Sequence, residues 1–155
     1  MRYVFGVTDD QLALNQQLCF ALYAASRATT AVYRPMLDEL GVTYPQYLVL
    51  LVLWERDGRG VREIGDELDL DSGTLSPLLK RLETLGLIER RRLTIDERRV
   101  EIHLSDAGRK LRERAVEIPA CLAARSGMSI AEAVALRESL VKLTASFRDQ
   151  ESTNR

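Results

Sequence analysis

The chain has 155 residues, a hydrophobic fraction of 46%, a charged fraction of 29% and a formal net charge of −1. This length fits one domain, or one small domain with helical extensions, and the apolar content suffices for a folded core. The longest apolar run, residues 47–54, is far too short to span a membrane, and the first residues lack the pattern of a secretory signal. Two cysteines without a signal make a structural disulfide framework unexpected, so a reducing cytoplasm is the expected location.

Helices are predicted for the first part of the chain. Residues 8–11 have the spacing of a capping box, which predicts a helix that runs to about Tyr33 or resumes to Leu40. A second capping box at residues 43–46, with a proline in the first turn, opens an apolar helix. Residues 56–60 are expected to form a loop.

The centre of the chain combines two short helices with a ribbon of two strands. Helices are expected over residues 61–68 and 74–85, with leucines on their inward faces. Alternating apolar and polar residues predict a strand over residues 100–104, and residues 87–93 are its expected partner. Residues 94–98 form the charged tip between the two strands.

The last third of the chain is expected to be helical again. One helix should run from Ser105 to about residue 124 and bend at Pro119, because proline lacks the backbone N–H that a helix interior uses. A third capping box begins at Ser129 and opens a final helix to about Phe147.

Basic residues concentrate in the middle of an otherwise acidic chain. Residues 80–99 hold seven basic and four acidic side chains, a net charge of +3, which leaves −4 for the remainder. A local excess of this kind, rather than the total charge, indicates binding to nucleic acid.

Helix, turn, helix and a two-stranded ribbon in this order are the layout of a winged helix-turn-helix. Small hydroxyls on the second helix allow close approach to base edges, and its cations can reach phosphates or guanine. An arginine at the ribbon tip can enter a narrow minor groove. Any one of these elements alone would suggest ordinary solvated charges on an α+β domain; their order favours DNA binding. The candidate DNA-binding residues are Ser72, Thr74, Ser76, Lys80, Arg81, Asp96, Arg98 and Arg99.

Three stretches carry a resemblance to a known family. Residues 61–68 (VREIGDEL) and 70–83 (LDSGTLSPLLKRLE) resemble the core of MarR-type repressors, and residues 96–100 (DERRV) resemble the wing signature of that family. The resemblance implies that Asp96 positions Arg98, which reaches DNA.

Two further stretches indicate the branch within that family. Residues 18–27 (LCFALYAASR) and 40–47 (LGVTYPQY) are most similar to the organic hydroperoxide resistance regulators. The resemblance implies a mainly α (α+β) fold: a winged helix-turn-helix over residues 43–104, and dimerisation helices over 8–40 and 105–149, in a single compact chain without an independent second domain. It also implies a homodimer that binds a pseudo-palindromic operator of double-stranded DNA, with two recognition helices in successive major grooves.

Cys19 lies in an apolar helical stretch, and tyrosines are the candidate hydrogen-bond donors to its thiolate. Tyr23 lies four residues further on the same helix face. Tyr33 shares that face but lies 14 residues on, roughly 21 Å along a straight helix, so it can reach Cys19 only from a partner helix packed antiparallel. The resemblance implies the same arrangement: the peroxide-sensing cysteine meets tyrosines across the dimer interface, here Tyr33 and Tyr44. An organic hydroperoxide would convert the thiolate to a sulfenic acid.

Cys121 leaves two outcomes open after this oxidation. The resemblance implies that the sulfenic acid condenses either with a small thiol or with a second cysteine near the C-terminal helices, where Cys121 stands. A disulfide requires the two Cα atoms within about 7 Å of each other, and the sequence does not place Cys121 near Cys19. Alternatively, Cys121 is a small apolar residue packed in a helix.

The sequence therefore favours a peroxide-sensing repressor, not an enzyme, with no cofactor. A second hypothesis is a repressor that senses a small phenolic ligand between the dimerisation helices. A thiol peroxidase using Cys19 and Cys121 is disfavoured, because the cation nearest to Cys19, Arg27, lies two turns away. His103 and Trp54 are expected to be structural, and the spacing of histidine and cysteines predicts no metal site.

Overall fold

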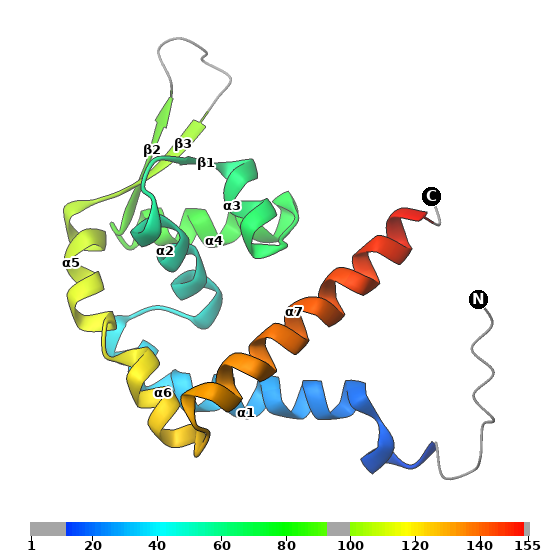
Figure 1. Cartoon of the computed structure of the whole chain (residues 1–155). Helices are drawn as coiled ribbons and strands as arrows, with labels where there is room; N and C mark the ends of the chain where they lie inside the picture. Colours follow the sequence, from blue (N-terminus) through cyan, green and yellow to red (C-terminus); the bar gives the residue numbers. More distant parts are fainter. Residues whose placement is uncertain (1–11, 93–99, 154–155) are drawn as a thin grey trace. The chain divides into compact units, whose positions relative to one another are not determined.

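The computed structural model of the chain describes residues 12–92 and 100–153 (Figure 1). Its contacts divide the chain into two compact units, Met1–Val116 and Glu117–Arg155. The first unit contains α1–α5 and the sheet, and the second contains α6 and α7. In chain order the elements are the 3₁₀ turn η2 (Leu14–Gln16), α1 (Leu18–Leu40), α2 (Tyr44–Glu55), β1 (Arg59–Gly60), α3 (Val61–Leu68), α4 (Ser72–Thr84), β2 (Ile88–Arg92), β3 (Val100–Leu104), α5 (Asp106–Ala115), α6 (Ile118–Ser126) and α7 (Ile130–Thr153).

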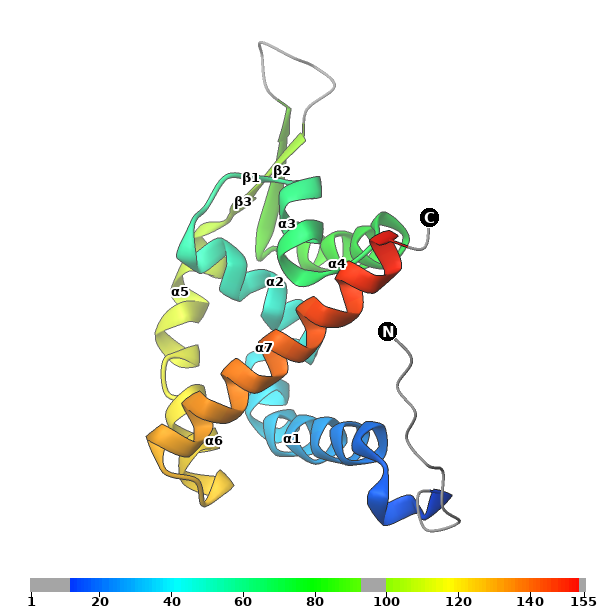
Figure 2. The same ribbon diagram turned by 45° about the vertical axis from the view of Figure 1, so that its right-hand side comes forward.

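The sheet of the first unit has three antiparallel strands in the order β1-β3-β2. The two predicted strands are confirmed as β2 and β3, which extend as a ribbon beyond α3 and α4 (Figure 2). The prediction of a loop over residues 56–60 is wrong at its end, because Arg59 and Gly60 pair with Ile102 and Glu101. Two residues are too few to show the alternation by which a strand is recognised in a sequence.

Helix α4 forms because its start is capped and one face is apolar. Asp71 is the N-cap, and its Oδ1 accepts a hydrogen bond from the Thr74 N–H at 2.9 Å, so the helix starts at Ser72 rather than at residue 74. Leu75, Leu79 and Leu82 are at most 1% exposed and pack into the core. These contacts fix α4 on the first unit and leave its opposite face free.

Helix α1 is longer and less buried than the helices of the core. It continues through Pro35 to Leu40 and ends at Gly41, whose φ of 73° is readily adopted by glycine. The predicted start of this helix, residues 8–11, lies outside the described residues. Residues 12–17, which the prediction also placed in the helix, are described and are not α-helical. Within this helix only Leu37 is buried.

The expected single helix after Ser105 is two helices, which corrects the prediction. Helix α5 ends at Ala115 and α6 begins at Ile118, with Pro119 in the first turn of α6. Proline is well tolerated in a first turn, because the N–H groups there have no partner within the helix. The capping box at Ser129 is confirmed, but α7 runs to Thr153 rather than to residue 147. No described helix is both long and apolar enough to cross a membrane.

Candidate DNA-binding surface and sensor site

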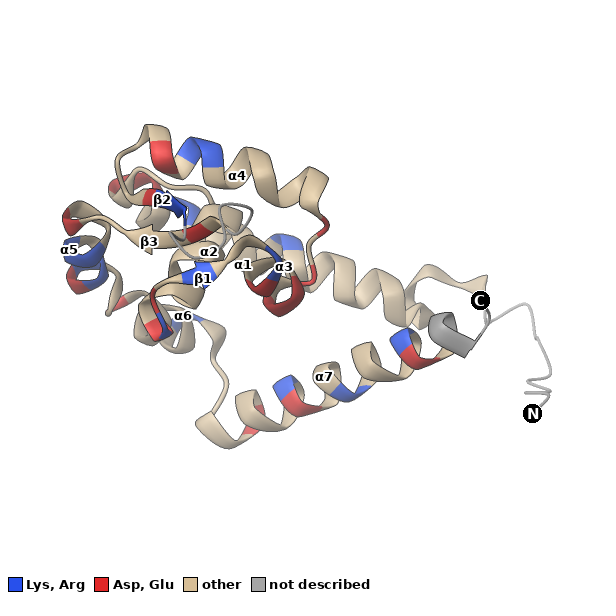
Figure 3. Cartoon of the chain, turned by 90° about the horizontal axis from the view of Figure 1, so that it is seen from above, with Lys and Arg blue, Asp and Glu red and all other residues tan. Residues whose placement is uncertain are grey.

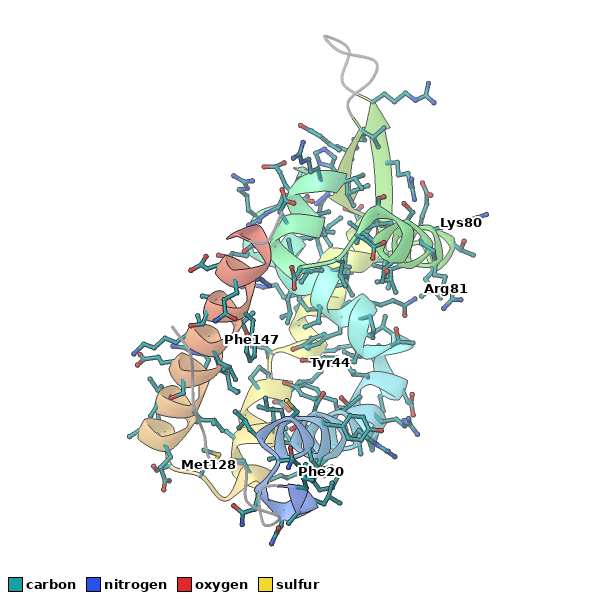
Figure 4. The ribbon with its side chains drawn as sticks, turned by 90° about the vertical axis from the view of Figure 1, so that its right-hand side faces the viewer. Phe20, Tyr44, Lys80, Arg81, Met128 and Phe147 are labelled. Atoms are coloured by element: carbon teal, nitrogen blue, oxygen red, sulfur yellow. The ribbon has the colours of Figure 1, made fainter. Side chains whose placement is uncertain are left out.

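The exposed face of α4 carries the residues predicted to read DNA. Lys80 and Arg81 project away from the helix into solvent (Figure 4). The three hydroxyl residues predicted with them are exposed as well: Ser72, Thr74 and Ser76. The Thr74 hydroxyl donates a hydrogen bond of 3.0 Å to Asp71 Oδ2, so this side chain serves the helix cap and offers acceptor lone pairs outward. Hydrogen bonds from the Thr74 N–H and then its hydroxyl lower the pKa of Asp71.

The basic side chains of α4 and β2 differ in whether an acidic side chain forms an ion pair with them. Arg90 on β2 pairs with Glu83 on α4 at 3.2 Å, and Arg91 pairs with Glu89 at 3.1 Å. Among the described residues, Lys80 and Arg81 form no ion pair. Figure 3 shows these basic positions on α4 and β2. The unpaired charges of α4 are therefore available to phosphate or base edges.

The predicted wing contacts fall outside the described residues. Asp96, Arg98 and Arg99 lie between β2 and β3 in the chain, and their roles stay predictions. At the base of the ribbon His103 Nε2 lies 3.1 Å from Glu101 Oε2, which fits the structural role expected for this histidine.

Cys19 lies in the first turn of α1 as a free and exposed thiol. A nucleophilic cysteine requires access, and this end of α1 leaves the thiol accessible. The sequence predicted the helix around Cys19 but not its place at the helix start.

Tyr33 and Tyr44 are partly buried and lie together in a row of aromatic rings. Their ring centroids are 5.0 Å apart, and Tyr47 lies 6.1 Å from Tyr33 and 6.5 Å from Tyr44. Burial, and then the neighbouring Tyr44 and Tyr47, raises the pKa of Tyr33 to about 12. The Tyr33 phenol therefore keeps its proton at neutral pH and can donate a hydrogen bond. The sequence does not single out Tyr47 as a member of this row, because a helix that is apolar on all sides does not show which face meets another aromatic residue.

Tyr23 contacts Arg27, four residues further along α1. Arg27 Nη1 donates to the Tyr23 hydroxyl at 3.1 Å, and the guanidinium carbon lies 5.5 Å from the centre of the ring. Tyr33 lies 14 residues beyond Cys19 on one continuous helix, roughly 21 Å along its axis. Cys121 is a free, partly buried thiol on α6, in the second unit.

A cavity of about 240 Å³, which no sequence pattern predicted, lies where α1 meets α2. Its lining is Thr30, Arg34, Leu37, Asp38, Val42, Thr43, Tyr44 and Pro45. Tyr44 thus belongs both to the aromatic row and to the wall of a cavity that contains a guanidinium. Within residues 12–92 and 100–153, no group of three His, Cys, Asp or Glu side chains is placed to hold a metal ion.

Comparison with known proteins gives consistent matches over most of the chain. The family model described as transcriptional regulator SarA/Rot matches residues 31–115. The organic hydroperoxide resistance transcriptional regulator of Bacillus subtilis (strain 168) is 48% identical over 134 residues, which cover 86% of this chain and 91% of that protein.

Among solved structures, two of the similar ones are of AbfR, a protein of Staphylococcus epidermidis. Reduced AbfR bound to DNA has a TM-score of 0.77 and 35% identity, covering 92% of this chain and 98% of that one. Disulfide-formed AbfR has a TM-score of 0.62 and 38% identity, covering 90% and 93%.

Proposed function

The chain belongs to the MarR-type winged-helix transcriptional regulators, in the branch of the organic hydroperoxide resistance regulators, and from this we propose that it is a peroxide-sensing repressor. A homodimer would bind a pseudo-palindromic operator in the cytoplasm and leave it when an organic hydroperoxide oxidises Cys19. One observation carries the proposal: an exposed cysteine lies in the first turn of α1, while Tyr33 lies 14 residues further along that helix, in contact with Tyr44 of α2.

DNA binding is supported by α4 and by the relatives. A similar chain, AbfR, has been solved bound to DNA in its reduced form. Within residues 12–92 and 100–153, Lys80 and Arg81 on the exposed face of α4 have no ion-pair partner, and cations of this kind contact phosphates or guanine. We assign the same contact surface to Ser72, Thr74 and Ser76, and the wing contact to Asp96, Arg98 and Arg99.

A dimer is supported by apolar side chains that the single chain leaves exposed. On α1, Leu18 is 58% and Phe20 is 42% exposed, although both are large and apolar. On α7, Val141 is 63% and Phe147 is 55% exposed. Contiguous apolar surfaces on a folded protein mark interaction sites, so both helices fit the dimerisation layer that the family resemblance implies.

The sensing step follows from the chemistry of a thiolate and a hydroperoxide. The Cys19 sulfur attacks the terminal oxygen of ROOH, so an S–O bond forms and the O–O bond breaks. Sulfur is oxidised to the sulfenic acid, and the alkoxide leaves and takes up a proton to become ROH. Tyr33 and Tyr44 of the partner chain would donate hydrogen bonds to the thiolate, with Tyr23 nearby. These hydrogen bonds would be disturbed when the sulfur carries an oxygen.

The next step has two forms, and Cys121 decides between them. Its thiol would condense with the sulfenic acid to give a disulfide and one water, or a small thiol would do so instead. A disulfide-formed state of AbfR supports the first form. Mass spectrometry of peroxide-treated protein distinguishes them: a Cys19–Cys121 crosslinked dimer establishes the first, and an added small thiol on Cys19 establishes the second.

Operator binding with and without cumene hydroperoxide tests the proposal. Wild type should bind when reduced and release DNA after oxidation, whereas Cys19→Ser should bind in both conditions. The matched control is Cys121→Ser, which keeps the sensing thiol and should still form the sulfenic acid. Release of DNA by peroxide from the Cys19→Ser variant would mean that Cys19 is not the sensor.

The cavity between α1 and α2 supports a second candidate, a repressor that responds to a small phenolic acid. A cavity of about 240 Å³ with Arg34 and Tyr44 in its wall could hold an aromatic ring and its carboxylate. If this is the signal, salicylate should release DNA equally well from wild type and from Cys19→Ser.

A further inference from the structure

Helix α2 joins the aromatic row at one of its ends to the base of the wing at its other end. Tyr44 is its first residue and Tyr47 lies one turn further, both in contact with Tyr33 of α1. Trp54 lies at the opposite end, next to the last residue of the helix. Twelve residues of α-helix span about 18 Å, so α2 bridges two regions that are far apart.

Trp54 fastens the far end of α2 to the start of α5. Its indole Nε1 donates a hydrogen bond of 2.9 Å to the carbonyl of Gly108, a residue 54 positions away in the chain. Its ring also meets Tyr47 edge-on, with centroids 6.1 Å apart. Tyr47 and Trp54 are seven residues apart and so lie on one face of α2, two turns from each other.

The start of α5 is in turn fixed to the end of α4. The Ser105 hydroxyl donates to the carbonyl of Gly86 at 2.6 Å, and the Ser105 N–H donates to Leu87 at 3.0 Å. Gly108 lies so close to Leu87 that an added Cβ would collide with the Leu87 carbonyl. Leu87 lies between α4 and β2, so this junction sets where the recognition helix ends and where the wing begins.

The middle of α2 has no room to absorb a displacement. Between its two ends α2 buries Val49, Leu50 and Leu53, each at most 1% exposed. Close-packed interiors have low compressibility and move as units. A shift of Tyr44 or Tyr47 would therefore move α2 as a rigid unit. The hydrogen bond from Trp54 to Gly108 would then transmit this movement to the junction of α4 and β2.

We propose that Tyr47 and Trp54 are positioning residues that couple the redox state of Cys19 to the DNA-binding surface, through the Trp54 indole and the Gly108 carbonyl. The proposal rests on the proposed function, because it requires that oxidation disturbs Tyr33 and Tyr44. Neither residue touches the sulfur or DNA in this scheme; each acts through the position of α2. Their removal should therefore weaken the response to oxidation more than the binding of the reduced protein.

The variant Trp54→Phe removes the N–H donor and keeps an aromatic ring. The reduced Trp54→Phe protein should bind the operator with a Kd within about threefold of the wild-type value. The ratio of the Kd of the oxidised protein to that of the reduced protein should be at least about fivefold smaller than in wild type, because fivefold is the lower end of usual allosteric coupling. Glu55→Gln is the matched control: it changes an exposed side chain next to Trp54 at the end of α2, so its ratio should equal that of wild type. A purely structural role for Trp54 would weaken both redox states equally and leave the ratio unchanged.

The wild-type protein offers a second measurement that needs no change at Trp54. This residue is the only tryptophan, so its fluorescence reports on α2 alone. Without DNA, oxidation should shift or quench the emission in wild type, and peroxide should leave the emission of Cys19→Ser unchanged. An emission unaffected by oxidation of Cys19, or a Trp54→Phe protein with the wild-type Kd ratio, would overturn the coupling alone. A wild-type protein that keeps its operator after Cys19 is oxidised would overturn the proposed function, and the coupling with it.

Discussion

The recognition helix α4 and the cysteine-bearing helix α1 are held in different ways. Helix α4 is stabilised by its own chain: Asp71 caps its start, its leucines are buried and Glu83 pairs with Arg90. Helix α1 is almost twice as long, yet it buries only Leu37 and leaves Cys19 exposed. The difference agrees with the proposal that each chain positions its own recognition helix, whereas the sensor would be completed by a partner. A signal at the sensor would then alter how the two recognition helices of a dimer are spaced.

The largest expected effect is a loss of stability caused by shortening a buried leucine of α4. Leu79→Ala should lower the free energy of unfolding by about 2–5 kcal/mol, since the side chain is fully buried. Urea unfolding at several protein concentrations measures this. The matched control is Leu85→Ala just after α4, where a half-exposed leucine should cost no more than about 0.5 kcal/mol. Equal losses in the two variants would contradict a core built around α4.

A smaller effect is expected from a charge on the DNA-binding face. Lys80→Ala should weaken operator binding roughly tenfold and lower the slope of log K against log salt by about 1, because one phosphate contact is lost. The control Lys110→Ala removes the same charge from the exposed side of α5. Titrations at several salt concentrations compare the two. If both variants keep the wild-type slope, Lys80 does not contact DNA phosphate.

The smallest expected effect concerns alkaline stability. The unfolded chain releases the Tyr33 proton near pH 10.0, whereas the folded chain holds it to about pH 12. The folded state thus binds one more proton in this interval, and its stability should fall as pH rises through it. Tyr33→Phe should make urea midpoints less dependent on pH between 10 and 11 than those of wild type. An unchanged pH dependence would mean that Tyr33 is not buried against Tyr44 in solution.

The sequence predicted those parts of the molecule that local patterns determine. The helix over residues 61–68, the buried leucines of α4 and the alternation of Ile102 and Leu104 are each recognisable within a few residues. The hydroxyls and cations of the second helix predicted the DNA-binding face, and helical spacing singled out Tyr23 and Tyr33. The family resemblance added Tyr44 and the role of Asp96.

Features that depend on distant contacts were not predictable in this way. Strand β1 forms because Arg59 pairs with Ile102, 43 positions away in the chain. Trp54 likewise donates a hydrogen bond to Gly108, 54 positions away. The sequence predicted one helix that bends at Pro119, whereas the chain leaves the helix earlier, at Val116, and starts a new helix at Ile118. Contacts of this kind are decided by packing and have no local signature.

The claim that the sensor is built by two chains can be tested with mixed dimers. In a dimer of one Cys19→Ser chain and one Tyr33→Phe chain, the remaining Cys19 faces an intact Tyr33 only if the tyrosine comes from the partner. We expect Tyr33→Phe homodimers to form sulfenic acid more slowly than wild type, and the mixed dimer to recover the wild-type rate for each remaining Cys19, measured by dimedone trapping. A mixed dimer as slow as the Tyr33→Phe homodimer, or a homodimer as fast as wild type, would contradict a site completed across the interface.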